Sequence, residues 1–211
     1  MKLVAFDFDG TLSESEMTVL LGEQYGVADD IADITERAMN GELSYAESLY
    51  ERAAMLEGMP EEKAMAAFDQ VTLRPGAADL IRELRDAGIH VAILTGGFER
   101  GVAAALEREG VAVDGIVANR LLLADGELTG EVEGPLIEGT KDDALDALLE
   151  RVGVERRDSV AVGDGANDLP MLQRAGTAIG FVPKPNVRPH CQVVVARMDR
   201  LQRVLEEDGV L

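Results

Sequence analysis

The stretch KLVAFDFDGTL, residues 2–12, decides the fold of this chain. Residues 3–6 form a short apolar run, which is typical of a strand that is buried on both faces. The strand leads into Asp7 and Asp9, two carboxylates separated by one residue. Such a pair at the end of a buried strand is unfavourable unless positive charge lies close to it. Asp9-Gly10 is also an ordinary turn sequence, so this stretch alone does not indicate a function. The other motifs of the chain have to be considered with it.

From residue 74 onward, apolar runs alternate with helical patterns. Strands are expected at 89–94, 116–118, 159–162, 178–179 and 193–195, and helices at 77–87, 98–109, 141–151 and 198–207. Residues 121–124 and 127–132, joined by Asp125-Gly126, predict a β-hairpin. The alternation predicts an α/β fold with a doubly wound parallel sheet, in which ligands bind beyond the carboxyl ends of the strands.

Residues 14–73 interrupt this pattern with helices alone. Asn40-Gly41 predicts the end of one helix, Ser44 with Glu47 resembles a capping box at the start of the next, and Pro60 opens another. We therefore expect two parts: an α/β core of residues 1–13 and 74–211, and an inserted helical cap of residues 14–73.

The composition excludes several classes of protein. With 211 residues, 46% hydrophobic, 22 Gly and 7 Pro, the chain can bury a core and is neither fibrous nor disordered. No signal peptide is predicted, and no apolar run approaches the roughly 20 residues of a membrane span. Cys191 is the only cysteine and cannot form an internal disulfide, which is typical of a cytoplasmic protein. Cys191, His90 and His190 fall outside every motif, and we expect structural or surface positions for them.

The chain is strongly acidic. Its 40 acidic and 20 basic residues give a formal charge of −20. Such a surface repels nucleic acid and anionic membranes, so neither is expected as a partner. Only four of the basic residues are lysines. An acidic excess with little lysine predicts a halophilic protein from a salt-rich cytoplasm, where a Debye length of about 3 Å at 1 M screens repulsion between carboxylates.

Three further motifs are expected at the sheet edge that carries Asp7 and Asp9. Thr95-Gly96-Gly97 follows one strand, Lys141 opens a helix, and an acidic cluster at 163–168 follows another strand. Carboxylates at close quarters require a cation, and ligation by oxygen alone suits Mg²⁺. A hydroxyl, glycine amides and a lysine suit the oxygens of a phosphoryl group. Each motif alone could be an ordinary turn or a surface lysine, but their order at one edge indicates phosphoryl transfer with an aspartate nucleophile.

These motifs resemble those of the haloacid dehalogenase superfamily of phosphatases and, within it, the phosphoserine phosphatases. Residues 7–11 are similar to the first motif of the superfamily, Thr95 to the second, Lys141 to the third and 163–168 to the fourth. The resemblance covers nearly the whole chain. It implies a Rossmann-like core, an inserted helical cap of the C1 type, and the activity of a phosphoric monoester hydrolase that uses Mg²⁺.

The resemblance also implies a role for each core residue. Asp7 would attack phosphorus, and Asp9 would act as general acid and then as general base. The side chains of Asp7 and Asp164 and the carbonyl of Asp9 would hold Mg²⁺, with Asp168 supporting the metal through water or a neighbouring ligand. The residues expected to hold the phosphoryl oxygens or the substrate are Thr95, Gly96, Lys141 and Asn167.

In the cap, the resemblance implies recognition of the substrate's amino acid by two residues. Glu16 would meet the ammonium group, and Arg52 would clamp the carboxylate with its planar guanidinium. Both could also be solvated helix charges. Two residues depart from the motifs of the phosphoserine phosphatases. Those enzymes commonly have serine in place of Thr95, and many have serine in place of Gly10.

The expected function is hydrolysis of O-phosphoserine to serine and phosphate through an aspartyl-phosphate, the last step of serine biosynthesis, in the cytoplasm. One alternative is a related phosphatase or phosphotransferase that acts on another small phosphate ester. Another is a phosphate-sensing module without turnover. The presence of Asp9 speaks against it, because a sensor does not need a general acid. The chain is expected to be a monomer or a homodimer.

Overall fold

The computed structural model describes residues 2–39 and 42–211, with the backbone alone at residue 39. A seven-stranded sheet has the order β4-β3-β2-β1-β5-β6-β7, and β4 pairs antiparallel with β3 while the other pairs are parallel. The strands are β1 Leu3–Phe6, β2 His90–Phe98, β3 Gly115–Ala124, β4 Glu127–Glu133, β5 Ser159–Gly163, β6 Thr177–Phe181 and β7 Val193–Val195. The α-helices are α1 Met17–Tyr25, α2 Ala28–Met39, α3 Tyr45–Ala54, α4 Glu61–Phe68, α5 Ala77–Asp86, α6 Glu99–Arg108, α7 Lys141–Val152, α8 Leu169–Arg174 and α9 Met198–Glu207. Short 3₁₀ turns are η1 Arg156–Asp158, η2 Ala166–Asp168 and η3 Arg188–His190.

Strand β1 lies at the centre of the sheet, and all four of its side chains are buried. Val4 and Phe6 point to one face, where they join the cluster that includes helices α5, α6 and α9. Leu3 and Ala5 point to the other face, toward α7 and α8. A strand covered by helices on both sides needs apolar residues at every position, which is the pattern of residues 3–6.

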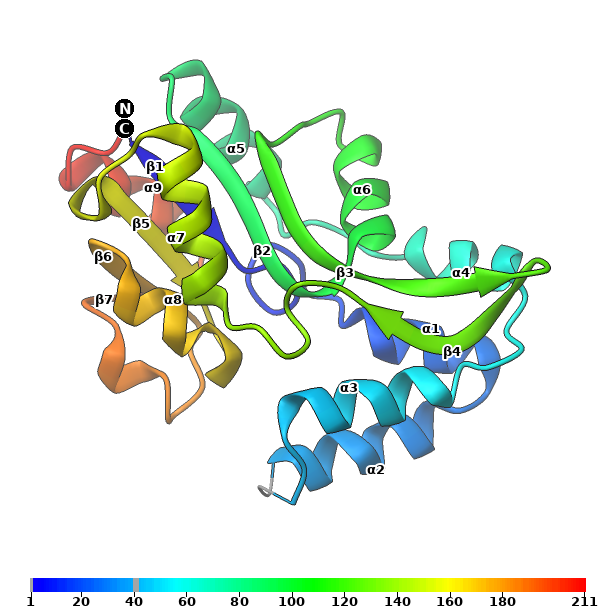
Figure 1. Cartoon of the computed structure of the whole chain (residues 1–211). Helices are drawn as coiled ribbons and strands as arrows, with labels where there is room; N and C mark the ends of the chain where they lie inside the picture. The colour runs from blue at the N-terminus through cyan, green and yellow to red at the C-terminus, as the bar shows by residue number, and fades with distance from the viewer. Residues whose placement is uncertain (1, 40–41) are drawn as a thin grey trace.

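The helices form one layer on each side of the sheet (Figure 1). Helices α7 and α8 cover the face that is turned toward the viewer, and α5 and α9 lie behind. Alanines in β1, β2, β5 and β6 lie in the cluster under α7 and α8, and their small side chains let these helices approach the sheet. The two ends of the chain lie close together, and Lys2 Nζ donates to the carbonyl of Gly209.

The insertion after β1 is helical in its described residues, as expected, and its helices α1 to α4 lie beside the sheet (Figure 1). The chain leaves and re-enters the core at adjacent points, because Ser13 and Leu73 form an antiparallel bridge. The hairpin β3–β4 reaches over the cap. Gly58 N–H donates to Leu128 O, and Leu128 N–H to Met59 O, both at 2.8 Å. The hairpin thus belongs to the central sheet and also holds a loop of the cap.

Several local predictions are confirmed. Ser44 and Glu47 form the expected capping box at the start of α3, and α9 has the predicted bounds. The hairpin turn at Asp125-Gly126 has positive φ at both residues, which suits its tight connection. Pro60 is the N-cap of α4, immediately before its first helical residue. The expected stop at Asn40-Gly41 lies outside the described residues.

Two local predictions are wrong, and one helix was not predicted. Strand β2 does not stop at residue 94 but continues to Phe98, since Phe98 pairs with Asn119 after an irregularity in register. The runs 116–118 and 121–124 are parts of one strand, β3, because its first half pairs with β2 and its second half with β4. Helix α8 was not predicted, because its six residues are too few to show a helical period.

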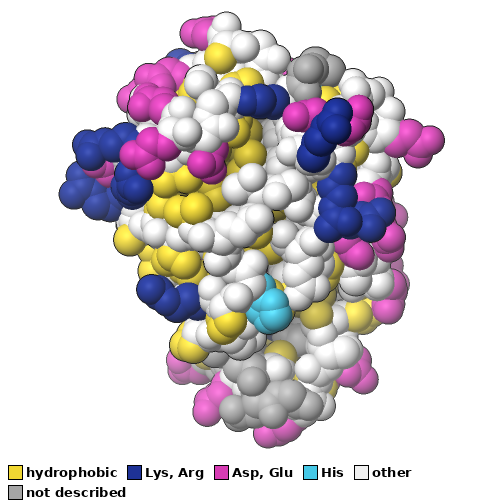
Figure 2. All heavy atoms as spheres, turned by 90° about the vertical axis from the view of Figure 1, so that its left-hand side faces the viewer, with side chains coloured by type: hydrophobic (Ala, Val, Ile, Leu, Met, Phe, Trp, Pro, Cys, Tyr) yellow, Lys and Arg dark blue, Asp and Glu magenta, His cyan; other side chains and the backbone are white. Residues whose placement is uncertain are grey.

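The surface carries both signs of charge. Figure 2 shows acidic and basic side chains toward the rim of one face, with hydrophobic and uncharged atoms between them. Many arginines pair with carboxylates, for example Arg37 with Glu51 at 2.8 Å and Arg100 with Glu61 at 2.7 Å. Within residues 2–39 and 42–211, no helix has the length and hydropathy that crossing a membrane requires.

Candidate active site

The first functional turn, residues 7–11, leaves β1 at the carboxyl edge of the sheet. Asp7 still pairs with β5, because its N–H donates to Val162 O at 2.8 Å. Gly10 has φ +85°, and a Cβ atom there would lie 2.7 Å from Asp164 Oδ1. Glycine is therefore required by the backbone angle and by the close approach of that carboxylate. The Thr11 hydroxyl donates to the same oxygen at 3.3 Å.

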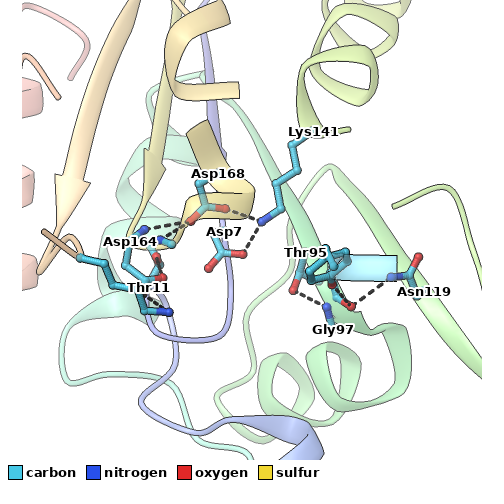
Figure 3. A network of polar contacts seen from close by, with 12 residues as sticks. Asp7, Thr11, Thr95, Gly97, Asn119, Lys141, Asp164 and Asp168 are labelled. Carbon is cyan, nitrogen blue, oxygen red and sulfur yellow. Dashed lines mark hydrogen bonds and ion pairs between the residues drawn. The ribbon is translucent and has the colours of Figure 1, made fainter. Parts of the chain in front are cut away.

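Asp7, Asp164 and Asp168 form one acidic cluster, in which one carboxylate oxygen of each lies within 4.8 Å of the others. Lys141 reaches this cluster from the first residue of α7. Its Nζ lies 2.5 Å from Asp7 Oδ1 and 2.5 Å from Asp168 Oδ1. Figure 3 shows the lysine between these two carboxylates, with Thr11 beside Asp164. Residues far apart in the sequence thus meet at the predicted edge of the sheet.

Asp168 is the best-held member of the cluster. Its Oδ1 accepts from Lys141, and its Oδ2 accepts from the N–H groups of Asp164 and Gly165, both at 2.9 Å. The missing side chain of Gly163 makes room, since a Cβ there would lie 2.6 Å from the Asp168 carboxylate. Both oxygens of Asp168 are therefore occupied by protein groups. This arrangement fits a residue that orients the groups around a metal site without binding the metal directly.

The pKa values of the cluster show the cost of so much buried negative charge. Burial, followed by the Asp168 carboxylate, raises the pKa of Asp7 to about 8, although Lys141 opposes the shift. The same two causes raise the pKa of Asp164 to about 6, with Lys184 opposing. A divalent cation would favour the ionised carboxylates, and a donor set made of oxygen atoms suits Mg²⁺. The residues present therefore fit a magnesium site.

Asp9 lies where the chain enters the cap. Its Oδ2 accepts from the N–H of Met17, the first residue of α1, at 3.3 Å. Its Oδ1 is buried and has no hydrogen-bond partner in the part of the chain that the structure describes. Burial, followed by the Glu16 charge, raises the pKa of Asp9 well above its ordinary value. A carboxyl group that keeps its proton and has an uncommitted oxygen is suited to general acid–base chemistry.

Thr95, Gly96 and Gly97 lie near the carboxyl end of strand β2. Thr95 is buried, and its Oγ1 accepts from the Gly97 N–H at 2.9 Å. The carbonyl of Gly96 accepts from Asn119 Nδ2 at 3.0 Å and from the Tyr45 hydroxyl at 3.1 Å. Figure 3 shows this group on the opposite side of Lys141 from Asp164. The edge therefore presents a lysine and a glycine-rich turn on one side of Asp7, and two further acids on the other.

The cap brings Glu16 and Arg52 toward the same site. Glu16 precedes α1, and its charge acts on both Asp9 and Arg52. Arg52 extends from α3, where its Nε donates to Ser48 O and its Nη1 to Thr18 Oγ1, both at 3.2 Å. One cation and one anion of the cap thus lie in mutual electrostatic reach, close to the general acid candidate.

A cleft of about 290 Å³ lies where α3 meets the core. Tyr45 lines it from the cap, and Gly96, Lys141 and Asn167 line it from the core. Asn167 is exposed in η2, next to buried Asp168. The predicted core residues therefore lie in the acidic cluster, in the adjoining segments or along this cleft, whereas Glu16 and Arg52 lie in the cap and do not line it.

Sequence reasoning missed three residues that shape the site: Tyr45, Asn119 and Arg74. Asn119 is fully buried, and its Oδ1 accepts from Leu136 N–H at 3.1 Å, so it joins the Gly96 turn to the segment before α7. A polar residue in an otherwise apolar strand was the available signal for Asn119. Nothing in the local sequence marked the other two, because their partners are 51 and 63 residues away.

Cys191 and the histidines lie apart from these residues. Cys191 is half-buried and packs against Gly180, and its Sγ is 3.5 Å from Val187 O. His190 is exposed and contacts Gln173. His90 begins β2, at the end of the strand opposite to the site.

Comparison with known proteins supports the same interpretation. Residues 4–173 match the haloacid dehalogenase-like hydrolase family. Phosphoserine phosphatase of Halobacterium salinarum is 60% identical over the full length of both chains, and that of Methanocaldococcus jannaschii is 37% identical over 97% of this chain and 96% of its own. A solved structure described as a phospho-aspartyl intermediate analogue of phosphoserine phosphatase superimposes with a TM-score of 0.88, at 37% identity and 98% coverage of each chain. The predicted resemblance and fold class are confirmed: this chain belongs to the haloacid dehalogenase-like hydrolase family.

Proposed function

We propose that the chain hydrolyses O-phosphoserine to serine and phosphate, with Asp7 as the nucleophile and Mg²⁺ as the cofactor. The observation that carries this proposal is the position of Asp7. One of its oxygens lies 2.5 Å from Lys141 Nζ, and the acids Asp164 and Asp168 lie within 4.8 Å. Asp9 is two residues away, with its Oδ1 free of protein partners among the described residues.

In the first step an oxygen of Asp7 attacks phosphorus, and an aspartyl-phosphate forms as the bond from phosphorus to the serine oxygen breaks. Asp9 donates its proton to the departing oxygen, which is the role that its raised pKa supports. In the second step Asp9 accepts a proton from water, which attacks phosphorus as the bond from phosphorus to the Asp7 oxygen breaks, so that phosphate leaves and the Asp7 carboxylate is restored. One carboxyl group can serve both steps because it is returned to its starting state.

The groups around Asp7 would hold the phosphoryl oxygens. Lys141 supplies a positive charge at the start of α7, and Thr95 supplies a hydroxyl beside the amides of Gly96 and Gly97. The metal would be held by the side chains of Asp7 and Asp164 and the carbonyl of Asp9, with Asp168 in support. It would supply positive charge that offsets the carboxylates and the phosphoryl oxygens.

Substrate choice belongs to the cap in this proposal. Arg52 would bind the carboxylate of the substrate, Glu16 its ammonium group, and Asn167 would contact the substrate from the core. The anchoring of Arg52 by Ser48 and Thr18 supports this assignment, because among the described residues it leaves Nη2 of the guanidinium without a hydrogen-bond partner. The full-length relatives from Halobacterium salinarum and Methanocaldococcus jannaschii are both phosphoserine phosphatases.

We further propose the setting in which the activity operates. The core would comprise residues 1–13 and 74–211 and the cap residues 14–73, divided at the Ser13–Leu73 bridge. The reaction would complete serine biosynthesis in the cytoplasm, with the chain as a monomer or a homodimer. The formal charge of −20 supports a requirement for salt.

Phosphate release from a panel of esters tests the proposal. The panel comprises O-phosphoserine, O-phosphothreonine, phosphoethanolamine, which lacks the carboxylate, and glycerol phosphate, each with Mg²⁺ or EDTA in molar KCl. Release should depend on Mg²⁺ and be fastest with O-phosphoserine. Equal rates for phosphoethanolamine would contradict the substrate assignment. No release from any ester would contradict phosphatase activity, and transfer to an added alcohol would indicate a phosphotransferase.

A further inference from the structure

Arg74 lies at the joint between the cap and the core. It follows Leu73, the partner of Ser13 in the bridge that closes the cap, and its N–H donates to Leu12 O at 2.8 Å. Its side chain is 21% exposed and turns back under the Gly10–Thr11 turn. None of the roles assigned above uses this arginine.

The guanidinium of Arg74 holds that turn through several contacts. Nη2 donates to the carbonyl of Gly10 and Nε to the carbonyl of Thr11, both at 3.0 Å. Nη1 pairs with Glu14 Oε1 at 2.8 Å. The guanidinium carbon lies over the ring of Phe181, 5.1 Å from its centroid. A planar group with several fixed donors can make all these contacts together, whereas a lysine cannot.

The turn that Arg74 holds is one wall of the proposed metal site. The backbone of Gly10 lies against the Asp164 carboxylate, and the Thr11 hydroxyl donates to Asp164 Oδ1 at 3.3 Å, as Figure 3 shows. Arg74 also contacts β6, the strand beside β5, which Asp164 follows. Phe181 ends β6, and the following loop donates Lys184 N–H to the carbonyl of Asp164 at 2.9 Å. Arg74 therefore contacts two segments that border Asp164, one at its carboxylate and one at its backbone carbonyl.

From this geometry we propose that Arg74 is a positioning residue for the metal site: it fixes the Gly10–Thr11 turn so that Thr11 holds the Asp164 carboxylate in the orientation that binds Mg²⁺. The inference deepens the proposed function and rests on its metal site. Asp164 has few other restraints on its side chain, because its contact with Lys184 Nζ is 3.8 Å long. The orientation of this carboxylate therefore depends on its contacts with the Gly10–Thr11 turn. An arginine that served stability alone would leave metal affinity unchanged.

The test is the affinity of the metal-free protein for Mg²⁺, measured by isothermal titration calorimetry in molar KCl. Arg74→Met should raise the dissociation constant about 10- to 100-fold, the usual effect of removing a group that orients a metal ligand. Arg74→Lys should give a similar loss, since it keeps the charge but not the fork of donors. Glu14→Gln should bind Mg²⁺ within about twofold of the unaltered chain, because both carbonyl contacts remain.

Arg85→Met is the matched control. Like Arg74, Arg85 is bound by both a carbonyl and a carboxylate, those of Ala112 and Asp114, but it lies at the far end of the sheet. In phosphate-release assays Arg74→Met should require more Mg²⁺ for half-maximal rate, while kcat at saturating Mg²⁺ and KM for O-phosphoserine stay within about threefold. If Arg74→Met does not fold, Arg74→Lys carries the test alone.

Two results would overturn the inference. One is a Mg²⁺ dissociation constant for both Arg74 variants within twofold of that of Arg85→Met. The other is a lower kcat at saturating Mg²⁺ with unchanged Mg²⁺ affinity. Absence of Mg²⁺ binding to the unaltered chain would contradict the metal site itself, so failure of the proposed function would be distinct from failure of the role of Arg74.

Discussion

Replacement of Lys141 by methionine should destabilise the metal-free protein, and the loss should grow with pH. The Lys141 ammonium contacts two buried carboxylates, Asp7 and Asp168, and its own side chain is 3% exposed. Removing one partner of a buried ion pair typically costs about 3–5 kcal/mol, because it leaves uncompensated charge. Methionine keeps most of the length and apolar volume of lysine, so the change removes chiefly the charge.

The sign of the pH dependence follows from Asp7. Burial raises the pKa of Asp7 to about 8 in the folded chain, above its ordinary value of 3.8. A raised folded pKa contributes stability that is fully present below the unfolded pKa and is lost as pH rises through the folded pKa. Lys141 lowers the pKa of Asp7, so its loss raises that pKa further and enlarges the penalty for ionisation. Asp7 holds its proton in both folded proteins well below pH 8, so its contribution to the cost of Lys141→Met should be constant there and should grow as pH rises through about 8, with a slope of at most about 1.4 kcal/mol per pH unit. The cost should reach about 3–5 kcal/mol above that pH, where Asp7 of the unaltered chain is ionised beside Lys141.

Urea unfolding with EDTA in molar KCl at pH 6.5, 8 and 9.5 measures this difference. Lys63→Met, which removes an exposed lysine of the cap, is the control and should change stability by less than about 1 kcal/mol at every pH. Saturating Mg²⁺ should reduce the difference at pH 8, because the ion replaces part of the missing positive charge. A loss below about 1 kcal/mol at pH 9.5, or a larger loss at pH 6.5 than at pH 9.5, would refute the electrostatic argument.

Four further predictions concern catalysis and salt. Asp7→Asn should abolish phosphate release while the far-UV circular dichroism stays unchanged, and appreciable turnover would remove Asp7 as the nucleophile. Arg52→Ala should raise KM for O-phosphoserine far more than for phosphoethanolamine, and equal effects would eliminate the carboxylate clamp. Tyr45→Phe should raise KM about fivefold at most, because the lost bond to Gly96 contributes about 1 kcal/mol. The unfolding temperature should rise between low and molar KCl, and a constant value would contradict the halophilic assignment.

The sequence predicted those parts of the fold that depend on local pattern. The apolar run before Asp7 fixes the central strand, and the rule that parallel strands present ligands at their carboxyl ends brought Thr95, Lys141 and the 163–168 cluster to one edge. The errors occurred where pairing partners decide the structure. β2 continues through Gly96 and Gly97 because β3 lies beside it, and no property of two glycines in sequence predicts a strand.

The details of the site depended on contacts that no local pattern encodes. Lys141 was expected near phosphate, but its pairing with Asp7 spans 134 residues and required the fold to be known. Asn119 and Arg74 act through backbone carbonyls, and a carbonyl is present at every residue. Sequence therefore predicts which side chains carry the chemistry more readily than it predicts the side chains that hold them in place.

The same contacts determine which part of the cap can move to admit substrate. Helices α1 and α4 are packed into the main hydrophobic cluster, where Met17 and Phe68 contact Gly101 of α6 and Phe68 meets Phe98 edge to face with ring centroids 6.3 Å apart. Exposing a large buried side chain costs about 1.5–3 kcal/mol, so separating several of them would consume much of the stability of a domain. Leu49 and Ala53 of α3 belong to the same cluster and anchor the later part of that helix. On the side of α3 that faces the cleft, two hydrogen bonds reach the core among the described residues, from Tyr45 to Gly96 and from Tyr50 to Glu138, each contributing about 1 kcal/mol. We therefore expect opening at the start of α3 while α1 and α4 stay in place, and amide hydrogen exchange should be faster in the first turn of α3 than within α1 or α4. Equal protection of all three helices would show that the cap moves as one body.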